Sequence, residues 1–229
     1  MKIVGLQKLT LLDFPGHVAC TIFLGGCNFK CPFCYNSSLI GNNFESLIDE
    51  NFLFSFLEKR KGKLDGVAIT GGEPLLNPKI KNFIKKIKNL GYLVKLDTNG
   101  SFPDVLATLI EENLVDYVAM DVKNSFEKYH QTTGVNLDVK NVKKSIEILL
   151  KNKVNYEFRT TLIKEFHTLE DIHLIGEAIK GAQNHYFQNF QAKESVLNSS
   201  LHPCDKEQLL EFEKVMKSYV KNCSLRGIE

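Results

Sequence analysis

The sequence alternates regularly between short apolar segments typical of β-strands and longer segments with the periodicity of amphipathic helices. Alternating units of this kind are joined by right-handed crossovers, so the strands form a parallel sheet covered by helices. We therefore expect an α/β fold. The six segments expected as strands are residues 18–24, 67–70, 92–96, 115–120, 155–162 and 185–190.

The segments between these strands carry helix signals. Asn77 is expected to cap a helix whose first turn contains Pro78. Thr168 and Asp171 have the spacing of a capping box at the start of another helix. Further helices are expected over residues 103–113, 139–149 and 205–221, and along the apolar stripe of Phe44, Leu47, Ile48, Phe52 and Phe56.

Chain length narrows the choice among α/β folds. A complete (β/α)8 barrel typically needs about 250 residues, whereas this chain has 229. We therefore expect a partial, open barrel of the (β/α)6 type, with a parallel sheet and helices on the outside, in a single domain spanning residues 1–229. A doubly wound sheet is the alternative. In either fold, functional groups lie at the carboxyl ends of the strands.

Polar, charged or glycine-rich groups follow or close the first four predicted strands and lie within the fifth and the sixth. Because the carboxyl ends of parallel strands meet at one edge of the sheet, we expect these groups to form a single mouth. The groups are the cysteine segment 27–34, Thr70–Pro74, Asp97–Gly100, Asp121–Lys123, Arg159 and Gln188–Asn189.

Cys27, Cys31 and Cys34 form the most specific motif of the chain. Thiolates at this spacing hold zinc or an iron–sulfur cluster, and the proline between them disfavours a buried helical stripe. A structural zinc ion needs a fourth ligand, which His17 or Cys20 could supply by reaching back. On a four-iron cluster, three cysteines leave one iron without a protein ligand, and this open iron is a place for chemistry.

Two further motifs have both a structural and a functional interpretation. The Gly71-Gly72-Glu73 segment is either a tight turn or a place where a ligand approaches the backbone, with Glu73 accepting hydrogen bonds from an ammonium group. The Asp97-Thr98 pair is either the start of a turn or a site for ribose hydroxyls or a cation. Lys123 and Arg159 form ordinary ion pairs or belong to the same site.

Composition excludes some partners. The 29 basic and 27 acidic residues give a formal net charge of +2, which does not suggest a nucleic-acid partner. The first residues lack the pattern of a signal peptide, and no apolar stretch has the length of a membrane span. We expect a cytoplasmic protein with no membrane partner, in which Cys20, Cys204 and Cys223 are structural thiols.

The cysteine motif, the aromatic Phe33 and the Gly-Gly-Glu-Pro segment together resemble the radical S-adenosylmethionine superfamily. Other segments resemble the activating proteins of glycyl-radical enzymes, with the best likeness to the branch that activates anaerobic ribonucleoside-triphosphate reductase. The likeness runs from about Gly5 to Ile228, and the chain departs from the pattern at Gly25 and Tyr35. The segments that carry it are residues 5–8, 12–16, 97–100, 119–123 and 158–161.

The resemblance implies a 4Fe–4S cluster on Cys27, Cys31 and Cys34, with S-adenosylmethionine chelating the remaining iron. Its other implied contacts divide into three sets. Gly71, Gly72 and Glu73 would hold the methionine amino group, Phe33 and Tyr35 would pack near the adenine, and Lys123 and Arg159 would approach the cofactor. Asp97, Thr98 and Asp121 would surround a monovalent cation beside the methionine carboxylate.

The resemblance also implies a mechanism. One electron from a flavodoxin- or ferredoxin-type donor cleaves the cofactor to methionine and a 5′-deoxyadenosyl radical, which removes a Cα hydrogen from a glycine of the partner enzyme. No side-chain acid or base is required, so no catalytic side chain is predicted. The alternatives are a radical enzyme acting on a small molecule, similar to 7-carboxy-7-deazaguanine synthase, and a metal- or cluster-binding module without catalysis.

Overall fold

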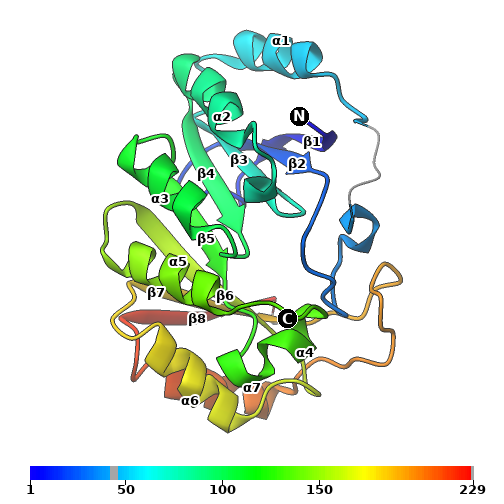
Figure 1. Ribbon diagram of the computed structural model, residues 1–229, viewed down its shortest axis with the longest axis vertical. Coiled ribbons are helices and arrows are strands. Elements are labelled where there is room, and N and C mark those ends of the chain that lie inside the picture. Colours follow the sequence, from blue (N-terminus) through cyan, green and yellow to red (C-terminus); the bar gives the residue numbers. More distant parts are fainter. Residues whose placement is uncertain (42–45, 228–229) are drawn as a thin grey trace.

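The computed structural model describes residues 1–41 and 46–227 (Figure 1). Its centre is one sheet of eight strands that lie side by side in sequence order. The first two strands are antiparallel, and each later strand is parallel to its neighbour. The strands are β1 (Ile3–Thr10), β2 (Ala19–Leu24), β3 (Gly66–Gly71), β4 (Leu93–Thr98), β5 (Tyr117–Asp121), β6 (Asn155–Leu162), β7 (Asn184–Asn189) and β8 (Asn222–Arg226).

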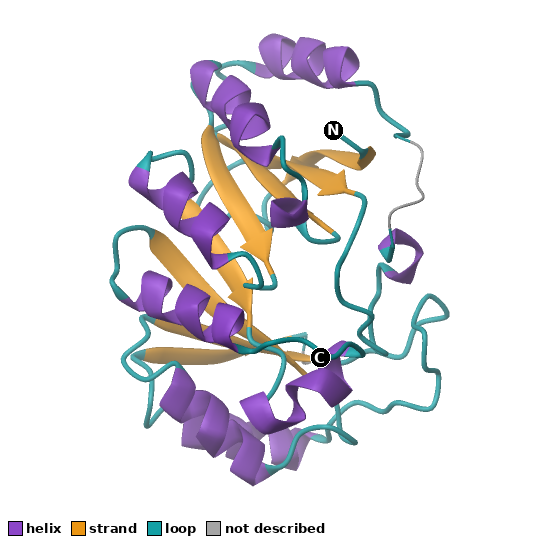
Figure 2. Ribbon diagram, viewed as in Figure 1, coloured by secondary structure: helices purple, strands orange, loops and turns teal. Residues whose placement is uncertain are grey.

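The main helices lie along the outer side of the curved sheet (Figure 2). A strand order without reversal puts all right-handed crossovers on one face, whereas a doubly wound sheet reverses its order and is covered on both faces. The end strands β1 and β8 do not pair with each other in the described part of the chain. The predicted open α/β barrel is therefore confirmed. The helices are α1 (Glu50–Arg60), α2 (Ile80–Asn89), α3 (Pro103–Glu111), α4 (Tyr129–Thr133), α5 (Lys140–Leu150), α6 (Leu169–Ala178) and α7 (Lys206–Met216), with short 3-10 turns at Ser37–Leu39, Pro74–Leu76 and Phe126–Lys128.

The sheet contains two strands that the sequence pattern did not predict, β1 and β8. Both lie at a sheet edge, where one side of the strand has no neighbouring strand among the described residues, although Ile3 of β1 forms an isolated bridge with Ile48. β1 buries only its terminal residues Ile3 and Thr10, and β8 buries only Cys223. Strands with so little burial lack the apolar runs by which the six inner strands were predicted.

The predicted helical stripe before β3 is only partly correct: Ile48 and Phe56 are half-buried against the core, but Leu47 and Ile48 precede the helix. Phe44 lies outside the described residues. Helix α1 begins after Asp49, whose side chain accepts hydrogen bonds from the N–H groups of Asn51 and Phe52. Its buried residues are Leu53 and Leu57, while the Phe52 side chain is exposed. The stripe was therefore predicted one position away from the helix face that packs on the core.

Helix α2 begins later than predicted. The 3-10 turn at Pro74–Leu76 occupies the segment after β3, and α2 starts at Ile80. Asn77 does accept a hydrogen bond from the Lys79 backbone N–H, at 2.9 Å, but it does so ahead of the helix. The capping box of Thr168 and Asp171 is confirmed at the start of α6.

Alternation along the strands separates the apolar core from the functional face. In β4, Val94 and Leu96 belong to the buried apolar core, whereas Lys95 and Asp97 form an ion pair with each other. Residues two apart in a strand share a face. The inner face of the sheet therefore carries charged groups toward the carboxyl ends of its strands.

No described helix is long and apolar enough to cross a membrane.

Candidate active site

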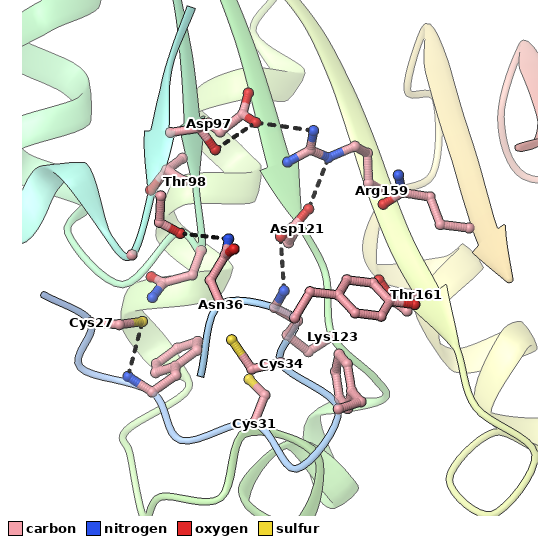
Figure 3. A pocket seen from close by; sticks show the side chains of 18 of the residues that line it. Cys27, Cys31, Cys34, Asn36, Asp97, Thr98, Asp121, Lys123, Arg159 and Thr161 are labelled. Atoms are coloured by element: carbon pink, nitrogen blue, oxygen red, sulfur yellow. Dashed lines mark hydrogen bonds and ion pairs between the residues drawn. The ribbon is translucent and has the colours of Figure 1, made fainter. Parts of the chain in front are cut away.

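A cavity of about 390 Å³ lies at the carboxyl ends of the strands (Figure 3). Its volume falls in the range of small-molecule sites. The predicted site residues all lie in the described part of the chain, and every one except Glu73 lines this cavity. The lining includes Cys27, Cys31, Phe33, Cys34, Tyr35, Gly71, Gly72, Asp97, Thr98, Asp121, Lys123 and Arg159.

The cysteine segment leaves β2 and crosses one side of the cavity without forming a helix. Figure 3 shows the sulfur atoms of Cys27, Cys31 and Cys34 directed to a shared space. The Phe29 backbone N–H donates a hydrogen bond to the Cys27 sulfur at 3.4 Å. The Lys30 N–H donates to the Thr133 carbonyl at 2.9 Å, which fixes the segment against α4.

The three thiols fit a cluster better than a single ion. They form no disulfide, and burial raises the pKa of Cys27 to about 11 and that of Cys31 to about 12. The thiolate forms therefore need a metal charge beside them, and metal binding releases their protons. In residues 1–41 and 46–227, no trio of His, Cys, Asp or Glu side chains is arranged to hold one metal ion. A cluster instead places each cysteine on a separate iron.

His17 and Cys20, the candidate fourth ligands of a zinc ion, lie away from the cysteine segment. His17 precedes β2 and lines a second cavity together with Asp116 and Asn155 at the amino ends of the strands. Cys20 is fully buried within β2 and pairs with Val67. The cysteine segment lies beyond the opposite end of β2, about 20 Å away for a strand of this length. Cys204 and Cys223 are also buried, as expected for structural thiols.

Gly71 and Gly72 hold the loop after β3 against the start of the cysteine segment. The Gly72 N–H donates to the Leu24 carbonyl at 2.8 Å, and the Glu73 N–H donates to the Gly26 carbonyl at 2.7 Å. A Cβ atom at Gly71 would overlap the Leu24 backbone, and one at Gly72 would overlap the Gly26 carbonyl. Both positions therefore require glycine for close backbone packing, and both still face the cavity.

Glu73 lies behind the cavity wall. Its Oε1 accepts hydrogen bonds from the Leu75 N–H at 3.0 Å and the Thr98 hydroxyl at 2.9 Å, and its Oε2 accepts from the Asn99 N–H at 2.6 Å. Burial raises the pKa of this carboxyl to about 7, against the lowering effect of these donors. In this arrangement Glu73 joins the loops after β3 and β4. The contact of its carboxylate with a ligand ammonium group stays a prediction.

Three strands contribute a network of charges to the cavity floor (Figure 3). Arg159 on β6 donates from Nη1 to Asp97 at 3.2 Å and from Nε to Asp121 at 2.9 Å. Lys123 donates to the second Asp121 oxygen at 2.8 Å. Burial would raise the pKa of Asp121, but the positive charges of Arg159 and Lys123 hold it well below its usual range. The carboxylates of Asp97 and Asp121 therefore remain ionised.

Lys95 is a member of this network that the sequence analysis missed. It forms an ion pair with the other Asp97 oxygen, and its side chain is almost fully buried. The Thr70 hydroxyl also donates to Asp97, at 3.1 Å. The signal for Lys95 was its position two residues before Asp97 in one strand, since this spacing puts both side chains on one face.

The opposite side of the cavity is lined by polar residues of β6, β7 and β8. Gln188 and Asn189 were expected at the mouth, whereas Thr161, Gln191 and Arg226 were not. Arg226 donates to both carboxylate oxygens of Glu157, at 3.0 Å each. Arg226 was missed because its strand, β8, was not predicted.

Two aromatic residues flank the cysteines. Tyr35 stacks on Phe190 with ring centroids 6.0 Å apart, and its hydroxyl accepts a hydrogen bond from the Gln191 N–H at 2.7 Å. Phe33 is buried, and the Lys123 ammonium lies 5.9 Å from the centre of its ring. Both rings line the cavity, where flat faces suit stacking on a heterocycle.

Comparisons with known proteins agree with this geometry. Residues 21–175 match the Radical SAM superfamily. A putative glycyl-radical enzyme activating enzyme of Methanocaldococcus jannaschii is 34% identical over 237 residues, which cover 98% of this chain and 95% of that protein. A 7-carboxy-7-deazaguanine synthase of Methanopyrus kandleri is 31% identical over 130 residues, which cover 48% of this chain and 51% of that protein.

A solved structure shares the fold. A domain of the pyruvate-formate lyase-activating enzyme from Bacteroides vulgatus superposes with a TM-score of 0.57 at 18% identity, covering 71% of this chain and 99% of that domain. The full-length match to the archaeal relative and the superfamily match over most of the chain decide the family. The chain belongs to the radical SAM superfamily, whose enzymes use a 4Fe–4S cluster and S-adenosylmethionine, and within it to the glycyl-radical enzyme activating enzymes.

Proposed function

We propose that this protein installs a glycyl radical on a partner enzyme, which is anaerobic ribonucleoside-triphosphate reductase. The observation that carries the proposal is the meeting of the three cysteines and the charge network of Asp97, Asp121 and Arg159 in one cavity. A cluster on the cysteines would then face groups that can bind an amino-acid and nucleoside cofactor.

The bound cluster and S-adenosylmethionine supply one-electron cleavage of a carbon–sulfur bond and hydrogen-atom abstraction. The residues of the chain bind and orient the cluster and the cofactor. Cys27, Cys31 and Cys34 would each hold one iron. Lys123 and Arg159 would donate hydrogen bonds to the methionine carboxylate, a charge-assisted pairing that also fixes orientation. Backbone carbonyl groups at Gly71 and Gly72 would accept hydrogen bonds from the methionine amino group.

The adenine would lie in the same cavity, beside the aromatic rings of the cysteine segment. Tyr35 and Phe33 provide flat faces there, and Tyr35 is fixed by its contacts with Phe190 and Gln191. The amide group of Gln188 can donate to and accept from the edge of a base, whereas both ends of the Asn189 amide are bonded to the Cys204 backbone at 3.1 Å. These residues give the adenine both a stacking surface and hydrogen-bonding partners.

The partner would reach the cavity through the open side of the sheet. β1 and β8 do not close the barrel in the described chain (Figure 1), and the cysteine segment and Arg226 at the end of β8 both line the cavity. A glycine-bearing loop of another protein could enter there. The electron would come from a flavodoxin- or ferredoxin-type donor, in the cytoplasm.

The test uses protein reconstituted anaerobically with iron and sulfide. With reductant and S-adenosylmethionine it should form 5′-deoxyadenosine, and addition of the reductase should produce a glycyl radical in its electron paramagnetic resonance spectrum. The matched control is a reductase with its radical glycine replaced by alanine. If 5′-deoxyadenosine forms but neither this reductase nor another glycyl-radical enzyme acquires the signal, the proposed activity is wrong.

A second candidate is a radical enzyme that acts on a purine-like small molecule. Two observations favour it, the partial likeness to 7-carboxy-7-deazaguanine synthase and the cluster of amide side chains at Gln188, Asn189 and Gln191. This function predicts that a heterocyclic substrate is turned over without a protein partner. Product formation from such a compound, in stoichiometric balance with consumed substrate, would replace the first proposal.

A further inference from the structure

The charge network contains more positive groups than the two carboxylates require. Asp97 is paired with Lys95 and Arg159, and Asp121 is paired with Arg159 and Lys123. Three cations therefore serve two anions. The family resemblance implies a monovalent cation at Asp97, Thr98 and Asp121. The partners of these three residues decide whether such an ion fits.

The proposed cation ligands are already engaged. One Asp97 oxygen accepts from Lys95, and the other accepts from Arg159 at 3.2 Å and Thr70 at 3.1 Å. The two Asp121 oxygens accept from Arg159 and Lys123 at 2.9 and 2.8 Å.

Thr98 is turned to another partner. Its hydroxyl donates to Glu73 at 2.9 Å and accepts from the Gly100 N–H at 3.1 Å. These two contacts use its one proton and one of its two lone pairs on the Glu73 side of the loop. Every side-chain oxygen of the three residues therefore already has at least one partner within the protein.

Lys95 is positioned to take the place of that ion. Its ammonium group lies against Asp97, below the residues that line the cavity, and the strand around it holds it at a fixed depth. A buried ammonium with a carboxylate partner has the same charge as a bound K⁺ or Na⁺. It differs in that the chain supplies it permanently.

We infer that Lys95 is an internal cation that holds Asp97 in position, so that this enzyme binds S-adenosylmethionine without a monovalent metal ion. Lys95 is a positioning residue, because it acts through Asp97 and does not line the cavity. The inference rests on cofactor binding and needs no glycyl-radical partner. Its failure can therefore be told apart from failure of the proposed function.

The test measures S-adenosylmethionine affinity of the cluster-loaded protein by anaerobic titration calorimetry, in K⁺ and in tetramethylammonium at matched ionic strength. The wild-type protein is expected to bind equally well in both. Lys95→Met is expected to bind about tenfold more weakly in tetramethylammonium, as for one lost charge-assisted hydrogen bond, and to recover in K⁺. Lys95→Arg, which keeps the charge, should remain independent of K⁺.

Lys88→Met is the matched control. It removes a lysine that pairs with Asp116 at 2.7 Å outside the cavity, and should leave the cation response unchanged. Thallium-205 resonance gives a second readout, with a bound signal expected for Lys95→Met and none for the wild type. Tighter wild-type binding in K⁺, or a thallium signal from the wild type, would overturn the inference. This wild-type comparison stands even if Lys95→Met does not fold.

Discussion

The Glu73 carboxylate accepts a hydrogen bond from the Asn99 backbone N–H at 2.6 Å, which joins the loop after β3 to the loop after β4. The first loop packs on Gly26 and Cys27 through Gly72, and the second continues directly from β4, whose Asp97 lines the cavity. The cluster side and the cofactor side of the site are thus connected through one buried side chain. Glu73 therefore acts on the site by holding these two loops in position.

Glu73→Gln should therefore damage the site without removing a group that lines it. The substituted amide would direct N–H groups toward the Asn99 or Thr98 donors, and an unsatisfied buried donor costs about 1–3 kcal/mol. We expect weaker binding of S-adenosylmethionine together with a lower melting temperature. Titration calorimetry and thermal unfolding of the cluster-loaded protein measure the two effects. Glu112→Gln, on the exposed surface beside Lys81, is the control, and equal behaviour of the two variants would contradict the role of Glu73.

Cys31→Ala should abolish cluster loading while leaving the fold in place. Cys31 is one of three thiols in the segment, and loss of one leaves two ligands for the cluster. The measurement is iron and sulfide content per chain after reconstitution, with circular dichroism to follow the fold. Cys204→Ala removes another buried thiol and should load normally. Full iron content in Cys31→Ala would show that the ligand assignment is wrong.

Gly72→Ala should separate the loop after β3 from the cysteine segment. The added Cβ would overlap the Gly26 carbonyl oxygen, which belongs to backbone and cannot rotate away. We expect this variant to retain the cluster poorly. The loss of cluster absorbance during gel filtration measures the effect. Gly91→Ala strains the backbone at a φ of +92°, but its Cβ would meet open space before β4, so it is a control for strain away from the cysteine segment and should retain the cluster as well as the wild type does. Equal retention by Gly72→Ala would mean that the two segments tolerate separation.

The fold class and most of the cavity could be predicted because they depend on local pattern. Alternating strands and helices determine a parallel sheet, and the carboxyl ends of its strands bring Cys27, Asp97, Asp121 and Arg159 together. The edge strand β8 could not be predicted in this way, since only Cys223 of its residues is buried. Arg226 was missed with it.

The function of individual polar residues depended on tertiary partners that no local pattern contains. Glu73 follows two glycines at a strand end, which is typical of a ligand contact, yet its donors come from residues 75, 98 and 99. Lys95 lies within an apolar strand, and its value as a cation follows from its depth below the cavity. Burial and partner geometry determine both roles.

The last prediction concerns acid stability, at a site outside the cavity lining. Asp171 in the capping box of α6 also accepts hydrogen bonds from Ser125 and Lys128, at 2.8 and 2.7 Å. Burial would raise the pKa of this carboxyl, but its hydrogen bonds, above all that from Lys128, lower it to about 2. A folded-state pKa below the unfolded value means that Asp171 stabilises the fold above pH 4, and that this contribution disappears as the pH falls through about 2.

Asp171→Asn should therefore unfold more easily at neutral pH and show a smaller loss of stability on acidification. Allowing for solvent screening of Lys128, the lost contribution is about 1 kcal/mol at pH 7. Urea unfolding of the two proteins at pH 7 and at pH 3 measures the difference, because the slope of stability with pH reports protons taken up on unfolding. Asp138→Asn, an exposed residue that pairs with Lys140 at 3.7 Å, serves as the control. If Asp171→Asn and the wild type lose stability in parallel between these pH values, Asp171 does not hold the ionised contacts described for it.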